Sequence, residues 1–199
     1  MISALLIVAM TLATARLALL VTLHVVGRTH YSPVKHAVSD YAVGPTRRLA
    51  AAMNAVTAAL FATLAAAVWW GYPNWTSHTS STIYLVVLSA IFVVLPALPT
   101  DLEGDRATPI GRAHLIAAVA WFALSYTLTG RFTQLVADSD SSLSGVLHTF
   151  NIIAMVSLIA LVISLLPALR TRFFGITERI FLGAISIFFL LLPIALLVD

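Results

Sequence analysis

Residues 3–27 read SALLIVAMTLATARLALLVTLHVVG, an apolar stretch whose only formally charged residue is Arg16. A helix rises about 1.5 Å per residue, so a stretch of this length can cross the hydrocarbon core of a bilayer, which is about 30 Å thick. The whole 199-residue chain has the same character, with 60% hydrophobic and 10% charged residues. Soluble domains have about 45–50% and about 25%. The sequence therefore predicts an integral membrane protein.

Five further apolar stretches predict an all-α fold, a bundle of six transmembrane helices in a single integral membrane domain, residues 1–199. The expected spans lie near residues 3–27, 49–71, 82–98, 110–130, 143–166 and 179–198. The third span ends in Pro96-Ala97-Leu98-Pro99, so we expect its last turn to be distorted. The second span carries a stripe of alanines that lets another helix approach closely. We therefore expect the second helix to be central.

Basic residues predict the orientation of the bundle. Of the 11 Lys and Arg residues, all except Arg16 and Arg131 lie in the three loops that follow the odd-numbered spans. Because basic residues resist translocation, these loops should be cytoplasmic and both termini should lie outside, in the plasma membrane of a prokaryote. The formal charge of +3 forms no basic stripe, so we expect membrane lipids rather than nucleic acid as partners. The sequence carries no signal for an oligomeric state.

The first basic loop is expected to hold a short interfacial helix. Ser32-Pro33 resembles an N-cap followed by proline at the first helical position, and Gly44-Pro45 resembles a stop. Val38 and Tyr41 then share one apolar face, as in a helix that lies in the membrane interface. The polar edge of this helix could cover the inner mouth of the bundle.

Arg16 is the most costly residue for a bilayer to hold, because a guanidinium at mid-membrane costs about 2.5–3.5 kcal/mol. The acidic residues fall in loops or at the ends of the expected helices, so none should pair with it at that depth. The expected partners are Asn54, Asn151, His148, Asp101, a backbone carbonyl or an anion that enters the bundle. Arg16 is then either a structural hydrogen-bonding group or a cation that binds a ligand.

Polar stripes on three spans predict a pocket inside the bundle, because polar groups are costly against lipid and should turn inward. His148 and Asn151 lie on the fifth span, His114, Trp121 and Ser125 lie on the fourth, and Asn54 and Thr57 lie on the second. Such a pocket suits an amphiphilic or anionic small molecule. The candidate ligand-binding residues are Arg16, Asn54, Trp121, His148 and Asn151. The alternative is that the stripes only form hydrogen bonds between helices.

Two other functions remain open. A lipid hydrolase at the cytoplasmic face would use the catalytic candidates Ser39, Asp40, Asp101 and His114. The chain has no Cys, so a metal such as zinc would need His and carboxylate ligands. Those candidates are His36, Asp40, Asp101 and His114, although their spacing is not diagnostic and no cofactor is predicted. A small-solute transporter is disfavoured because coupled carriers usually keep an acidic residue at mid-membrane.

Several short motifs resemble those of the domain of unknown function (DUF) 998 family. They are His36 with Ser39-Asp40-Tyr41 and Gly44-Pro45, Pro99-Thr100-Asp101 with Gly104, Gly111 with His114, and His148 with Asn151. The resemblance covers nearly the whole chain and implies a multi-spanning membrane protein without an established activity. A looser similarity is to the membrane hydrolases that include alkaline ceramidases, which place Ser, Asp and His around zinc. The chain lacks the paired histidines that those enzymes carry near the chain's end.

Overall fold

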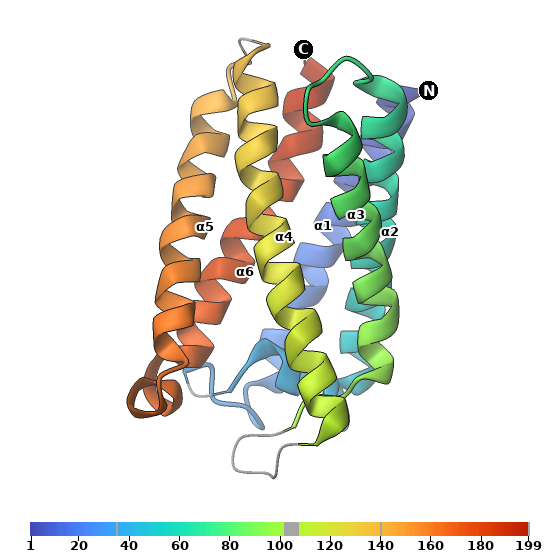
Figure 1. Cartoon of the computed structure of the whole chain (residues 1–199). Helices are drawn as coiled ribbons and strands as arrows, with labels where there is room; N and C mark the ends of the chain where they lie inside the picture. Colours follow the sequence, from blue (N-terminus) through green and yellow to red (C-terminus); the bar gives the residue numbers. More distant parts are fainter. Residues whose placement is uncertain (35, 102–107, 140, 199) are drawn as a thin grey trace.

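The computed structural model consists of helices that follow the apolar stretches one for one (Figure 1). It describes residues 1–34, 36–101, 108–139 and 141–198. The α-helices are α1 Ile2–Gly27, α2 Arg47–Gly71, α3 His78–Val94, α4 Pro109–Ala137, α5 Ser144–Ser164 and α6 Pro167–Val198. Three short 3-10 helices are η1 Val38–Ala42, η2 Gly44–Thr46 and η3 Leu95–Ala97. Six helices in the described part of the chain are long and apolar enough to cross a membrane, which confirms the predicted fold class.

Helix boundaries differ most from expectation where charged residues lie beside a span. Helix α6 begins at Pro167 rather than near residue 179, and α4 continues to Ala137 rather than residue 130. Arg131 donates to the hydroxyls of Ser80 and Ser81 on α3, and Arg179 donates to carbonyls of the first basic loop. Because these charged groups are hydrogen-bonded, they do not require the helix to stop. Helix α3 ends at Val94 and passes into the 3-10 turn that contains Pro96, as the proline pattern predicted.

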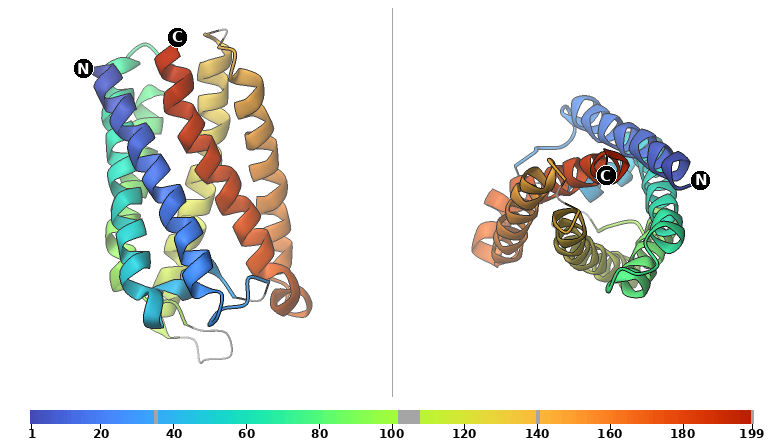
Figure 2. Two further views of the ribbon diagram at one scale, coloured as in Figure 1. Left: turned by 180° about the vertical axis from the view of Figure 1, so that it is seen from behind. Right: turned by 90° about the horizontal axis from the view of Figure 1, so that it is seen from above.

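The six helices pack in chain order, and the last one returns to the first. Each helix packs against its successor, and α6 also packs against α1. Viewed from above, the helices surround a common interior (Figure 2). The two termini lie at one end of the bundle and the first basic loop lies at the other, which we call the basic face (Figure 1).

Helix α6, not α2, is the most buried span. Inside the structure, 61% of its apolar window is buried, against 44% for α2. Phe181, Phe188 and Phe189 are all buried, and Phe189 meets Phe61 of α2 edge to face at 5.2 Å. Packing between membrane helices depends on such van der Waals contact, which large aromatic side chains supply as well as small residues do. The alanine-striped helix α2 is thus the second most buried of the six described spans, after α6.

The first loop does contain a short helix, but a shorter one than predicted. It is the 3-10 helix η1, and it begins at Val38 rather than after Ser32-Pro33. Val38 and Tyr41 are buried, in line with their predicted apolar face. Gly44 then has φ 82°, a left-handed conformation that a side chain would disfavour, and it separates η1 from η2.

Candidate functional site

The bundle contains a cavity of about 570 Å³ that extends inward from the basic face. Its lining comes from all six α-helices and from η3, and residues 37–40 and 42 of the first basic loop also line it. Three predicted ligand-binding residues line it: Arg16, Asn54 and Trp121. The four catalytic candidates Ser39, Asp40, Asp101 and His114 line it too. The fold therefore gathers residues from distant parts of the sequence into one chamber.

Arg16 lies inside the bundle, with 5% of its surface exposed. Its guanidinium donates a hydrogen bond to the hydroxyl of Ser186 on α6, and Ser186 donates in turn to the carbonyl of Leu182. The inward orientation was predicted, but the partner was not among the groups proposed for it. A guanidinium has five N–H donors. Within the described residues only Ser186 accepts from Arg16, so the other donors remain for whatever fills the cavity.

Asn54 and Trp121 form a polar spot and an aromatic wall in the same cavity. The Asn54 side chain is 9% exposed, and no hydrogen bond joins its amide to the described residues. Trp121 is buried and packs against Phe92 and Phe122, with ring centroids 5.3 Å and 4.7 Å away. The chamber thus combines unsatisfied polar groups with a large apolar surface, as sites for amphiphilic molecules do.

Asp101 holds Thr108, the N-cap residue of α4. Its carboxylate accepts hydrogen bonds from the backbone N–H of Thr108 at 2.8 Å and from the Thr108 hydroxyl at 2.7 Å. These two bonds, together with the positive charge of Arg112, hold the pKa of Asp101 below its usual value of 3.8. A side chain at Gly111 would collide with this carboxylate. Asp101 therefore has a structural task at the cavity edge.

His114 presents one ring nitrogen to a backbone group. Its Nδ1 lies 2.7 Å from the carbonyl oxygen of Leu98, so Nδ1 carries the proton and donates it. The Nε2 of the neutral ring is then an acceptor, and the His114 side chain lines the cavity. With buried Trp121 and Ser125, His114 makes the inward stripe that the sequence predicted on this helix. The hydroxyl of Ser125 has no partner among the described residues.

Glu178 lies within α6 and faces the cavity, with 5% of its surface exposed. Its carboxylate accepts a hydrogen bond from the backbone N–H of Val38 at 2.6 Å, which ties the first basic loop to α6. The expectation that every acidic residue lies in a loop or at a helix end is therefore wrong. It failed because the sixth span was expected to start at Arg179, whereas α6 begins at Pro167 and includes Glu178.

Arg179 holds the first basic loop from another side of α6. Its guanidinium donates to five groups at 2.7–2.9 Å: the carbonyls of Pro33, His36 and Gly175, the Tyr41 hydroxyl and Nε2 of His24. Gly175 allows this close approach, because a Cβ there would lie 2.6–2.8 Å from three backbone oxygens of the loop. The part of the loop that lines the cavity is thus fixed to α6 by two adjacent residues of opposite charge.

The predicted zinc ligands do not gather in the described residues, which contain no group of three or more His, Asp and Glu side chains able to hold a metal. His36 lies apart from the cavity lining, and its Nδ1 accepts the backbone N–H of Ser32 at 2.9 Å. Asp101 is engaged with Thr108. Gly104 of the resemblance motif lies outside the described residues. The zinc hypothesis therefore gains no support.

His148 and Asn151 do not line the cavity. His148 is exposed, so the expectation that it turns inward is wrong. It lies just over one turn from the start of α5, where an imidazole can reach the head groups. The Asn151 side chain accepts a hydrogen bond from the Thr129 hydroxyl at 2.8 Å and so joins α5 to α4. Asn151 thus makes an interhelical contact, the alternative that the sequence left open.

The similarity of the chain to known proteins is at the level of a family. Residues 2–195 match the family described as protein of unknown function (DUF998). No curated protein and no solved structure matches the chain. The match extends over all six helices and every residue of the cavity, and the chain therefore belongs to the DUF998 family.

Proposed function

We propose that the protein binds an amphiphilic molecule in the cavity, with a polar or anionic head group against Arg16 and Asn54. The observation that carries this proposal is a guanidinium buried in a membrane-spanning helix and open to a cavity of about 570 Å³. Pockets for small molecules have volumes of about 300–1,000 Å³, so the chamber is large enough for a head group and part of a tail.

The charge of Arg16 supports an anionic head group. The described residues give it one hydrogen-bond partner, the neutral hydroxyl of Ser186. A buried charge is costly unless a partner compensates it, and a carboxylate or phosphate is a strong partner for a guanidinium. Asp40 and Glu178 accept hydrogen bonds from backbone N–H groups of the first basic loop. The proposed head group would supply the negative charge that Arg16 lacks.

The apolar lining supports a hydrocarbon tail that reaches the membrane. Leu115 and Val119 of α4 and Val162 and Leu165 of α5 line the cavity and are 43–58% exposed. Side chains that are both lining and exposed mark the place where the cavity approaches the outer surface of the bundle. In a bilayer this surface contacts acyl chains. A tail can therefore leave between α4 and α5 without entering water.

Trp121 is a reporter for the test, because the other three tryptophans lie at the opposite end of the bundle. A variant with Trp69→Phe, Trp70→Phe and Trp75→Phe keeps Trp121 as its single tryptophan. We expect a brominated fatty acid, dibromostearate, to quench this fluorescence saturably in detergent. Bromine quenches only close to the ring, so saturable quenching reports entry into the cavity.

Two variants in this background, each with an alanine replaced by phenylalanine, distinguish probe binding in the cavity from probe binding on the outer surface. Ala118→Phe fills part of the cavity lining and should abolish saturable quenching. Ala59→Phe adds the same ring to an exposed position on α2 and should leave quenching unchanged. Equal quenching of both variants would show that the probe contacts the protein elsewhere, and the proposal would be wrong.

We also propose that the basic face is cytoplasmic, with both termini outside. The support is the concentration of Lys and Arg in the three loops at that face, as in the positive-inside pattern.

A further inference from the structure

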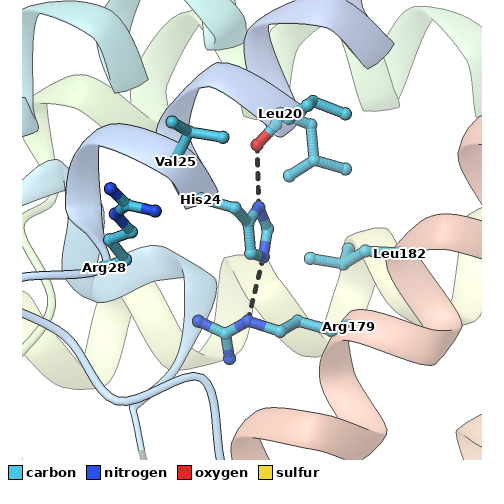
Figure 3. A pocket seen from close by; sticks show the side chains of 7 residues that line it. Leu20, His24, Val25, Arg28, Arg179 and Leu182 are labelled. Carbon is cyan, nitrogen blue, oxygen red and sulfur yellow. Dashed lines mark hydrogen bonds between the residues drawn. The ribbon is translucent and has the colours of Figure 1, made fainter.

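A second concave site lies on the outside of the bundle, between α1 and α6, and is separate from the cavity (Figure 3). Its volume is about 390 Å³. The apolar lining consists of Leu20, Val21, Val25 and Leu182, and the polar lining consists of His24, Arg28 and Arg179. We propose that this groove binds the phosphate head group and one acyl chain of an anionic phospholipid from the leaflet at the basic face.

Two guanidinium groups give the groove its charge. Arg28 follows the last residue of α1, is exposed, and has no hydrogen-bond or ion-pair partner among the described residues. Arg179 donates only to neutral acceptors, because the neighbouring acid, Glu178, accepts from Val38 instead. Arg28 can donate charge-assisted hydrogen bonds to a phosphate, and Arg179 adds its positive charge and the one Nη2 N–H that is not engaged with Tyr41.

The charged end of the groove is held in place before a lipid arrives. The Nδ1 of His24 donates to the carbonyl of Leu20 at 2.7 Å, so its Nε2 is an acceptor for the Nε of Arg179 at 2.9 Å (Figure 3). Arg179 also donates to the first basic loop and cannot swing away without breaking those bonds. A fixed binding group loses little conformational entropy when a ligand binds. Arg28 is then the adaptable partner.

The apolar walls distinguish a lipid from free phosphate. Val21 and Val25 are 56% and 57% exposed and lie along α1 toward the middle of the membrane from Arg28. An acyl chain that follows them would continue directly from a head group at Arg28. Leu20 and Leu182 line both the groove and the cavity and form the partition between them. Binding in the groove therefore does not require the cavity to be filled.

The test is native mass spectrometry of the full chain in detergent with phosphatidylglycerol or phosphatidylcholine as the lipid. We expect retention of one phosphatidylglycerol in preference to phosphatidylcholine, and we expect Arg28→Gln to weaken phosphatidylglycerol binding about fivefold. Arg48→Gln is the matched control, because it removes the same charge from an exposed position at the same face but outside the groove. Equal losses from both variants would indicate a general attraction and would overturn the proposal.

A second variant tests the chain site. Val21→Trp places a large side chain in the apolar part of the groove and leaves both arginines intact, so it should weaken phosphatidylglycerol binding. In a separate competition experiment with the parent protein, glycerol 3-phosphate, which has no acyl chain, should not displace phosphatidylglycerol. Unchanged lipid binding by Val21→Trp, or competition by glycerol 3-phosphate, would show that no acyl chain is recognised and would refute the lipid site. Ala118→Phe alters the lining of the cavity and not that of the groove. It should abolish the quenching of Trp121 but leave phosphatidylglycerol binding unchanged, so the two proposals can be refuted independently.

Discussion

Replacing Arg16 by leucine separates a structural from a ligand-binding role. The lost hydrogen bond to Ser186 is one from a charged donor, which contributes about 1.5–3 kcal/mol. The cost of placing the guanidinium at this depth, about 2.5–3.5 kcal/mol, disappears in the same variant. The ligand-free Arg16→Leu protein should therefore lie between about 0.5 kcal/mol less stable and about 2 kcal/mol more stable than the parent.

The assay combines thermal unfolding in detergent with the quenching of Trp121 by dibromostearate. We expect Arg16→Leu to melt near the parent temperature and to lose saturable quenching. Arg16→Gln, which keeps a donor for Ser186 but removes the charge, should lose it as well. A melting temperature lowered by more than about 4 °C, with quenching reduced only in proportion to the folded fraction, would refute the reasoning and leave Arg16 as a structural group.

Three further outcomes are expected. Gly175→Ala should destabilise the protein by about 1–3 kcal/mol in thermal unfolding, because its Cβ would meet backbone oxygens that cannot move independently. Gly183→Ala is the control, since a Cβ there meets nothing within 4 Å, and it should not lower the stability by this amount. The depressed pKa of Asp101 contributes stability that is complete above pH 3.8 and is lost as the pH falls through the pKa of the folded state. Asp101→Asn should therefore make unfolding less sensitive to acid below pH 4, and an unchanged acid profile would contradict this. A reporter enzyme fused after Asp199 should be active only outside the cytoplasm, and a cytoplasmic signal would reverse the proposed orientation.

Apolar length predicted the number and order of the helices, since a single segment in lipid can satisfy its own backbone hydrogen bonds only as a helix. The cost of polar groups against lipid predicted that Arg16 and Trp121 turn inward. The rotation of one helix against another is not encoded in a single stretch, and that rotation selected Ser186 as the partner of Arg16. A signal for Ser186 exists, because it stands alone as a polar residue within an apolar run of the sixth span.

Charged residues at the membrane surface account for most of the remaining differences. Glu178 and Arg179 were assigned to the edge of a span, whereas α6 continues through them and directs them to two different sites. Neighbouring helix residues differ by about 100° in direction, so Glu178 faces the cavity and Arg179 faces the groove. His148 was misplaced for a related reason, because an imidazole near a helix end has water within reach.

The contact between α1 and α6 also sets an order of events during biosynthesis. The first span to leave the ribosome finds one of its partners only when the last span has been made. Until then Arg16 lacks Ser186, and the first basic loop lacks both of its attachments on α6. Five inserted helices would thus hold an exposed guanidinium and an open chamber. The final helix therefore supplies the partner of Arg16 and closes the bundle against α1.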